Sequence, residues 1–380
     1  MFVGVKNFLF AVSILLGAII GAGIFGIPYA ISRSGILPGL FYFFILGILV
    51  TLIHLFFAEI SLRTKGDHRL VGFSRKYLGS KGDIFIASSI IVGTVGSLLA
   101  YLILTGDFLQ IMFSPWINLS PFYFTVFFWI ILFLLFSRGI KTIAPTTFVT
   151  NSLFLLIILL TIVFALPKFE ISNLTLFNSA NIFLPFGVIM FSLVGWSSIP
   201  EMIGISKGLK NKVNFKKAII FTTAIVLFIY LLFTLVIIGV TGRNISVDAI
   251  SGLIPFLGMK IIFLGALAGV ITLADSFLVL ALYLRNTLVY DFKITPKISS
   301  LIAGFSPMLL FLVGFRNFIG TIGFVGTLIG AVEGIMIIII FQRAKTLGDR
   351  EPEYNFKVPK ILLYFLMLIL VFGAISQFFL

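Results

Sequence analysis

Long apolar runs separated by short polar segments dominate the chain. A membrane-spanning helix needs about 20 predominantly apolar residues, each adding 1.5 Å along the axis. Few residues remain between the apolar runs. The sequence therefore predicts an all-α membrane protein in which residues 1–380 form a single transmembrane domain. The predicted transmembrane helices are eleven: 8–30, 38–62, 84–112, 121–137, 143–166, 181–203, 217–240, 257–284, 299–315, 319–341 and 360–379.

The composition excludes several classes of protein. Hydrophobic residues make up 60% of the chain and charged residues 11%, whereas a soluble domain holds roughly 25% charge. With no Cys and 2 His, the chain has no thiol ligands and no residue set for a transition metal. It also lacks a GxxxxGK[ST] phosphate-binding loop and a nucleophile paired with a base. We therefore expect neither an enzyme nor an ATP-driven pump.

The distribution of basic residues predicts the orientation. The chain carries 27 Lys and Arg against 13 Asp and Glu. If the amino terminus is cytoplasmic, 22 of the 27 basic residues fall on the cytoplasmic side. This asymmetry is the positive-inside signature of a multi-pass protein of the cell membrane, and it predicts an extracytoplasmic carboxyl terminus. The net charge of +14 then faces the lipid headgroups, so no nucleic-acid partner is needed to explain it.

The most basic connection, residues 63–83, has two interpretations. Its apolar residues alternate with Arg and Lys in a way typical of a short helix lying at the membrane surface. The same residues also fit a solvated basic loop beside anionic lipid.

Two of the predicted spans contain helix breakers at their centres. Segment 17–28 holds four glycines and Pro28, and segment 191–201 holds Gly195 and Pro200. Glycine weakens a helix and proline removes a hydrogen-bond donor. The two segments share one spacing, since Pro28 follows Gly23 by five residues and Pro200 follows Gly195 by five. The second segment comes five spans after the first and therefore enters the membrane from the opposite side, which predicts an inverted repeat of five helices plus an eleventh.

Interrupted spans at matching positions favour a secondary transporter. Unwound backbone in hydrocarbon leaves N–H and C=O groups unpaired, and it persists only beside protein, water or a ligand. The amino end of a half-helix attracts a carboxylate and the carboxyl end attracts a cation, so paired breaks suit a zwitterionic amino acid. A passive channel or lipid scramblase on the same scaffold remains the alternative. The many Gly, Ile and Phe residues near the breaks favour an apolar or aromatic substrate.

Three stretches resemble the amino acid/auxin permease family, which includes bacterial aromatic amino acid permeases and belongs to the amino acid, polyamine and organocation superfamily. They are residues 17–35, 186–201 and 274–278. The resemblance implies the leucine-transporter-like fold, with repeats at about 8–166 and 181–341 and an extra helix at about 360–379. It also implies alternating access driven by Na⁺ or H⁺, with no other cofactor.

The same resemblance implies a substrate site at the two breaks. The backbone of the first break would face the substrate carboxylate, and the second break would meet its ammonium or side chain. Trp196 would line or gate the pocket, and the third span would contribute polar side chains, although Tyr101 equally fits a packed aromatic. The implied substrate residues are Gly21, Ala22, Gly23, Ser97, Tyr101, Ser192, Val194, Gly195, Trp196 and Ser197.

A coupling site is implied in the eighth span. In sodium-coupled relatives, hydroxyl residues at the positions of Asp275 and Ser276 complete a cation site with carbonyls, which here belong to Gly17, Ile20 and Thr272. This chain places a carboxylate there instead, which would either bind Na⁺ or take up a proton.

Glu201 follows Pro200 and has two interpretations as well. It would gate the pathway, or it would simply complement a helix amino terminus.

Overall fold

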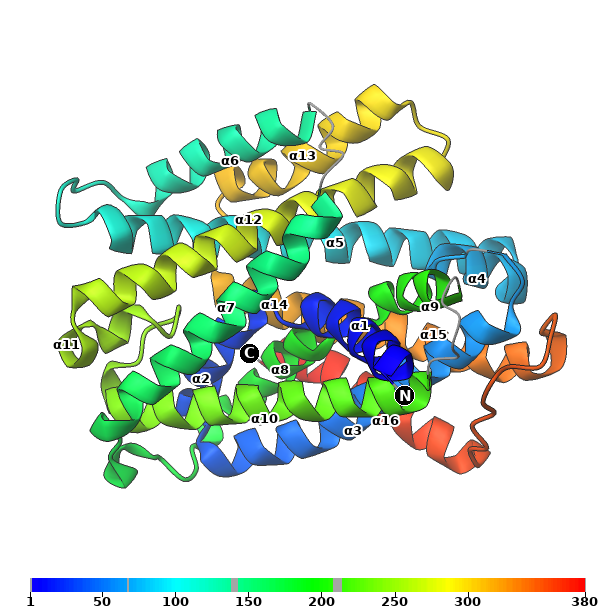
Figure 1. Cartoon of the computed structure of the whole chain (residues 1–380), viewed down its shortest axis with the longest axis horizontal. Coiled ribbons are helices and arrows are strands. Elements are labelled where there is room, and N and C mark those ends of the chain that lie inside the picture. The colour runs from blue at the N-terminus through cyan, green and yellow to red at the C-terminus, as the bar shows by residue number, and fades with distance from the viewer. Residues whose placement is uncertain (1, 67, 138–142, 208–213, 380) are drawn as a thin grey trace.

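The computed structural model describes residues 2–379 except 67, 138–142 and 208–213, and these residues form helices and connecting loops with no strand (Figure 1). The α-helices are α1 Phe2–Ile19, α2 Gly23–Ser34, α3 Ile36–Arg63, α4 Leu70–Leu78, α5 Ser80–Phe113, α6 Pro121–Ser137, α7 Ile143–Ala165, α8 Leu184–Leu193, α9 Ile199–Lys207, α10 Phe215–Thr241, α11 Ile254–Leu257, α12 Met259–Tyr290, α13 Pro296–Val313, α14 Phe318–Phe324, α15 Gly330–Leu347 and α16 Lys360–Ser376. A 3₁₀ turn, η4 (Trp196–Ser198), precedes α9, and a π-helical turn, η7 (Val325–Ile329), joins α14 to α15. Most of the long helices run side by side along one axis of the bundle.

Each predicted span coincides with a helix or a pair of helices. Among the described residues, nine helical segments are long and apolar enough to cross a membrane, and the α1 and α2 pair, bent by 57°, makes ten. The remaining predicted span is α6, an apolar helix of 17 residues. The chain is therefore a multi-pass membrane protein. The count of eleven and the inverted repeat stay predictions.

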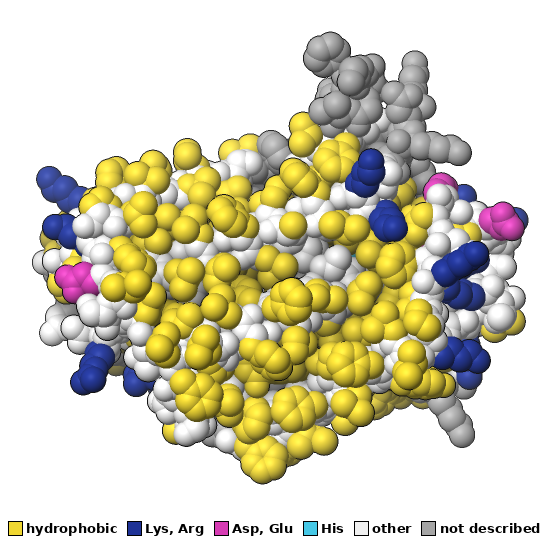
Figure 2. Space-filling model, turned by 90° about the horizontal axis from the view of Figure 1, so that it is seen from below, with side chains coloured by type: hydrophobic (Ala, Val, Ile, Leu, Met, Phe, Trp, Pro, Cys, Tyr) yellow, Lys and Arg dark blue, Asp and Glu magenta, His cyan; other side chains and the backbone are white. Residues whose placement is uncertain are grey.

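An apolar belt surrounds the bundle. Large side chains such as Phe44, Phe127 and Leu368 are 71%, 62% and 65% exposed on the helices. On the face shown in Figure 2, hydrophobic side chains cover the middle of the molecule, and Lys and Arg gather at its two ends. So large an apolar surface is unfavourable in water and is typical of side chains that face lipid. Of the basic residues that predict orientation, Arg138, Lys141, Lys210 and Lys212 lie outside the described residues.

The basic connection after α3 forms a short helix whose apolar side chains pack inside the protein. Helix α4 buries its apolar side chains inside the protein, and Phe73 packs edge-on against Phe57 of α3 with ring centroids 5.5 Å apart. Arg75 and Lys76 lie on the exposed side. The short helix predicted within residues 63–83 is therefore present, whereas the interpretation of this stretch as a solvated loop is wrong, and the apolar side chains of α4 pack against neighbouring helices.

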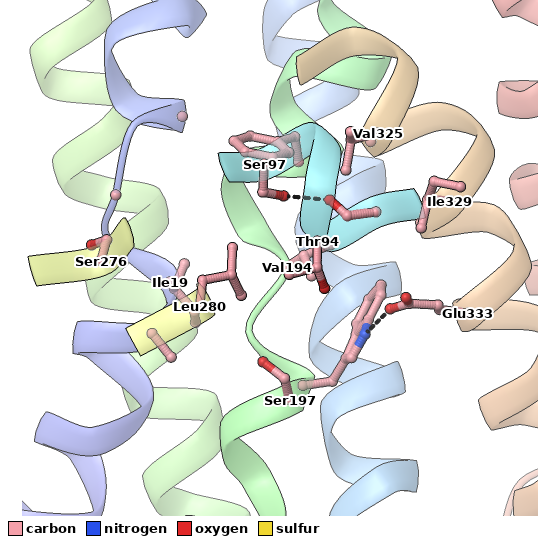
Figure 3. A pocket seen from close by; sticks show the side chains of 18 of the residues that line it. Ile19, Thr94, Ser97, Val194, Ser197, Ser276, Leu280, Val325, Ile329 and Glu333 are labelled. Carbon is pink, nitrogen blue, oxygen red and sulfur yellow. Dashed lines mark hydrogen bonds between the residues drawn. The ribbon is translucent and has the colours of Figure 1, made fainter. Parts of the chain in front are cut away.

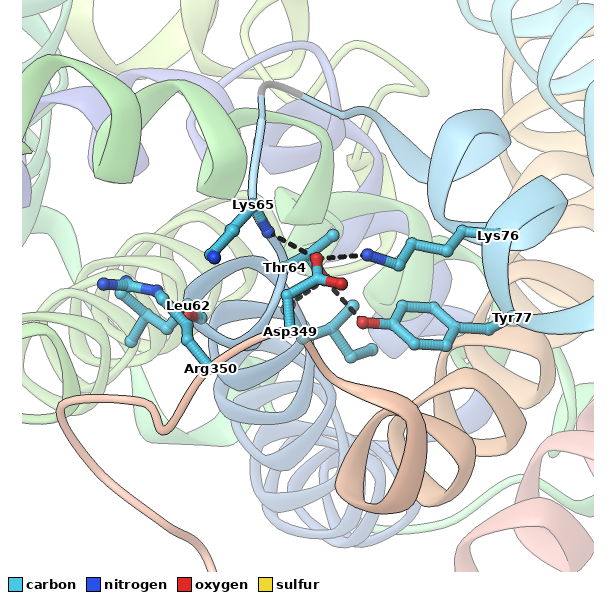
Figure 4. A network of polar contacts seen from close by, with 8 residues as sticks. Leu62, Thr64, Lys65, Lys76, Tyr77, Asp349 and Arg350 are labelled. Atoms are coloured by element: carbon cyan, nitrogen blue, oxygen red, sulfur yellow. Dashed lines mark hydrogen bonds and ion pairs between the residues drawn. The ribbon is translucent and has the colours of Figure 1, made fainter.

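A polar network joins this connection to the segment after α15 (Figure 4). The Asp349 carboxylate accepts a hydrogen bond from the Lys65 backbone at 2.8 Å and pairs with the Lys76 ammonium. The Arg63 carbonyl accepts the backbone N–H groups of Asp349 and Arg350 at 2.9 and 3.2 Å. The network thus fixes the end of α15 against the loop between α3 and α4.

Replacing Asp349 by asparagine is expected to lower thermal stability only when the carboxyl is ionised. The hydrogen bond from Lys76 holds the pKa of Asp349 below its usual range. A group with a lowered native pKa stabilises the fold above its unfolded pKa of about 4, and this contribution is lost as the pH falls through the native pKa. We expect Asp349→Asn to reduce the Tm by about 2 °C at pH 7, with the difference shrinking as acid protonates the Asp349 carboxyl.

The control is Glu353→Gln, which removes an exposed pair with Arg350 three residues away. Exposed pairs contribute little, so this variant is expected to match the parent at every pH. Equal melting of Asp349→Asn and the parent at pH 7 would contradict a stabilising role for the network.

Candidate functional site

The first helix break lies between α1 and α2. The last amide of the incoming helix is Ile20, which donates to the Leu16 carbonyl at 2.9 Å, and the outgoing helix begins at Gly23. The first N–H groups and last C=O groups of a helix have no partners within it, so this break exposes both kinds of group in the membrane. Pro28 does not cause the break, because it lies inside α2.

The second break lies between α8 and η4. Helix α8 ends at Leu193, Val194 adopts an extended conformation (φ −65°, ψ 123°), and the 3₁₀ turn begins at Trp196. Pro200 is the second residue of α9, a position where its missing N–H removes no helical hydrogen bond. Both predicted interruptions are therefore present in the described structure.

The two breaks lie against each other. A Cβ atom built on Gly23 would come within 2.6 Å of the Ser192 Cα, and one built on Gly195 would come within 2.5 Å of the Ile19 side chain. Only glycine lets the two backbones approach this closely. Gly195 therefore packs the second break against the Ile19 side chain at the end of α1.

A tyrosine hydroxyl joins the two breaks. Tyr230 of α10 is fully buried, and its hydroxyl lies 3.0 Å from the Ile19 carbonyl and 3.3 Å from the Ser192 carbonyl. These carbonyls belong to the last turns of α1 and α8, where helical partners are missing. Sequence reasoning missed Tyr230, because nothing distinguishes it in the sequence from the other nine tyrosines.

A cavity of about 160 Å³ opens beside the breaks, between α1, α5, α12 and α15. In Figure 3, Ser97, Thr94, Val325, Ile329 and Glu333 lie on one side of it and Ile19, Ser276 and Leu280 on the other. Every predicted substrate residue except Gly195 lines this cavity: Gly21, Ala22, Gly23, Ser97, Tyr101, Ser192, Val194, Trp196 and Ser197.

The predicted coupling residues divide into two groups. Gly17, Ile20 and Ser276 line the cavity, whereas Thr272 and Asp275 are not among its lining residues. Asp275 accepts a hydrogen bond from Thr150 of α7 at 3.4 Å. The structure therefore turns Asp275 toward α7, a neighbour that the sequence argument did not include.

Two further observations concern the surroundings of Asp275. The Thr272 hydroxyl, one helical turn earlier, is buried without a hydrogen-bond partner. The Asn151 amide, next to Thr150 on α7, donates to the Gly17 carbonyl at 3.4 Å. Helix α7 thus contacts both the first break and the carboxylate of α12.

Glu201 lies at the mouth of the cavity rather than inside it. Its carboxylate pairs with Arg69 at 3.3 Å, and both side chains are partly exposed. The Arg69 guanidinium also lies 5.3 Å from the centre of the Tyr283 ring. Because Arg69 and Tyr283 line the cavity, this cluster stands between the cavity and the end of the bundle that carries α4.

The cavity also contains a carboxylate to which the sequence assigned no role. Glu333 of α15 lines it and accepts a hydrogen bond from the indole N–H of Trp196 at 2.7 Å (Figure 3). Its sequence position, near the middle of the tenth predicted span, was the available signal, since ionisable residues within membranes are expensive and usually functional.

An all-helical, multi-pass bundle whose polar cavity lies at two adjacent helix breaks defines a membrane protein with an internal small-molecule site. The chain belongs to the tryptophan/tyrosine permease family, whose profile matches residues 5–377. No individual curated protein matches it. Family membership makes the chain an amino acid transporter of a membrane and not an enzyme, and it confirms the resemblance to aromatic amino acid permeases.

Proposed function

We propose that the chain is a secondary active transporter that moves an aromatic amino acid across the cell membrane by alternating access, driven by a Na⁺ or H⁺ gradient. The observation that carries this proposal is the pair of helix breaks joined by the Tyr230 hydroxyl and facing one cavity. Interrupted helices at a central site are typical of transporters in which one part of the bundle rocks or gates against the other around the bound substrate.

The substrate zwitterion would lie across the two breaks. The amino end of α2, at Gly21, Ala22 and Gly23, supplies N–H groups and a positive dipole end for the carboxylate. The carboxyl end of α8, at Ser192 and Val194, supplies carbonyls for the ammonium. Ser97, Tyr101, Trp196 and Ser197 then border the substrate side chain.

The coupling ion would bind beside the first break. Carbonyl oxygens of Gly17 and Ile20 with side-chain oxygens of Thr272, Asp275 and Ser276 form an all-oxygen set suited to Na⁺, and Asp275 alone suits a proton. The buried Thr272 hydroxyl without a partner supports a ligand there. The Arg69 and Glu201 pair would close the cytoplasmic side of the cavity. In this arrangement α6 is the eleventh span, the amino terminus is cytoplasmic and the carboxyl terminus is extracytoplasmic.

The test is uptake of labelled tryptophan and tyrosine into liposomes containing the purified protein. We expect accumulation when a Na⁺ or pH gradient is imposed, and exchange of labelled for unlabelled amino acid without a gradient. Flux that ignores both gradients and shows no exchange would instead identify a passive channel. Absence of flux for every amino acid would contradict the proposal.

Asp275→Asn is expected to uncouple transport from the driving ion. Removing the charge should reduce gradient-driven accumulation at least tenfold, because the ion would lose its anionic ligand, whereas exchange should persist. The control is Asp291→Asn, the same change just past the end of α12, which should preserve ion dependence. Unchanged ion dependence in Asp275→Asn would remove this residue from the coupling site.

A further inference from the structure

A carboxylate and an indole connect α15 to the second helix break. Trp196 is the first residue of η4, directly after Val194 and Gly195, and it is 2% exposed. Its indole N–H is a single donor, and it is given to the Glu333 carboxylate at 2.7 Å. Because Glu333 lies in the first turn of α15, this hydrogen bond fixes the start of η4 against that helix.

No cation neutralises this carboxylate within the described part of the chain. None of the five ion pairs found there includes Glu333. A charged group in a membrane interior is disfavoured unless paired, so a lone carboxylate readily takes up a proton. Glu333 also lines the cavity, which gives a proton a path to it.

A histidine packs beside the same indole. His54 of α3 is fully buried, its ring lies 6.2 Å from that of Trp196 at 64°, and neither of its nitrogens has a hydrogen-bond partner. The Trp196 ring thus lies between the His54 ring on α3 and the Glu333 carboxylate on α15. The hydrogen bond to Glu333 is the polar contact that positions it.

We propose that Glu333 is a proton-binding site that controls the second helix break through Trp196. The ionised carboxylate makes a charge-assisted hydrogen bond with the indole and holds η4 in place. A proton from cavity water binds one carboxylate oxygen, removes the charge and weakens this bond, which frees η4 to move. The inference rests on the proposed function, because movement of this break matters only if the site alternates between two sides.

Most other titratable groups on the helices around Glu333 are in ion pairs or have exposed side chains. Arg69, before α4, pairs with Glu201. Glu59 at the far end of α3 pairs with Arg63. On α4, Arg75 and Lys76 pair with Asp83 and Asp349. The side chains of Lys360 and Tyr364 on α16 are exposed. This leaves three groups that face the cavity or the Trp196 ring as competitors for the proton: His54 on α3, Tyr101 on α5 and Tyr283 on α12.

The first test reads the indole directly. In the double variant Trp116→Phe and Trp129→Phe, Trp196 is the only tryptophan, and its fluorescence can be titrated from pH 5 to 9 in lipid nanodiscs. We expect a single sigmoidal change that disappears in Glu333→Gln, which keeps an acceptor but cannot titrate. Glu333→Asp should restore the transition with a shifted midpoint. If loss of Trp129 destabilises the protein, the difference spectrum between the parent and Glu333→Gln gives the same reading.

Several results would overturn the proposal. A flat titration in the parent would do so, as would an unchanged transition in Glu333→Gln. A transition that survives Glu333→Gln and disappears in His54→Gln would assign the proton to the histidine instead.

The second test separates this inference from the proposed function. We expect tryptophan exchange in liposomes to accelerate at least fivefold between pH 8 and pH 6 in the parent and to be independent of pH in Glu333→Gln. If exchange by Glu333→Gln still depends on pH, the role of Glu333 is contradicted, whereas the proposed transport function is not. Absence of exchange in the parent would contradict the proposed function, and the fluorescence titration would still decide whether Glu333 binds the proton.

Discussion

Replacing Gly23 with alanine is expected to abolish transport. The new Cβ would lie 2.3 Å from the Ser192 Oγ and 2.6 Å from its Cα, and the second of these atoms is backbone that cannot rotate away. Forcing α2 from α8 costs about 1–3 kcal/mol by analogy with other overpacked sites. It would also displace the carbonyls of Ile19 and Ser192 from the Tyr230 hydroxyl. Amino acid exchange in liposomes should fall more than tenfold, with a lower Tm.

Gly204→Ala is the matched control. Gly204 lies in α9, at the end of the helical span Leu184–Gly204 that contains the second break, and a Cβ there meets no atom of the described residues within 4 Å. This variant is expected to transport and melt like the parent. Normal exchange by Gly23→Ala would mean that the close contact between the breaks is not required.

Tyr230→Phe is expected to cause the second largest loss. It removes the single O–H proton that the Ile19 and Ser192 carbonyls share, so a buried carbonyl loses its donor at this point. Each unsatisfied group costs about 1–3 kcal/mol, and the membrane interior supplies little water to replace the lost bond. We expect a lower Tm and a reduction of exchange of about tenfold.

The corresponding control is Tyr290→Phe, since the Tyr290 side chain at the end of α12 is 67% exposed. It should leave both measurements unchanged. A stable and fully active Tyr230→Phe would show that the breaks hold their relative position without the bridging hydroxyl.

Hydrophobicity and helix-breaking residues predicted the spans and both breaks, but not the point at which each helix ends. The sequence placed the interruptions at Gly and Pro together. In the structure, Pro28 lies inside α2, several residues after the break, and Pro200 lies in the first turn of α9, where a helix tolerates proline. The unwound residues are the small ones before each proline, where two backbones meet and helical hydrogen bonds are exchanged for a tyrosine hydroxyl.

Contacts between distant helices account for what the sequence could not predict. Tyr230 and Glu333 lie in largely apolar spans, and their partners, Ile19 and Trp196, are 211 and 137 residues away. Asp275 shows the same difficulty, because its position on α12 was predictable, whereas the Thr150 contact depends on how α7 packs beside it. Periodicity within one helix carries no information on which neighbour a given side chain meets.

The polar network around Asp349 also has a consequence for synthesis of the chain. Lys65 and Asp349 are separated by 284 residues, so the nascent polypeptide contains α4 long before its anchor exists. At a translation rate of about 5–20 residues per second, roughly 15 to 60 s pass between synthesis of Lys65 and synthesis of Asp349, and only then can the polar network form. A translation product that stops short of Asp349 would leave the Arg63 carbonyl and the Lys76 ammonium without these partners, so its α4 would lack the attachment to the segment after α15.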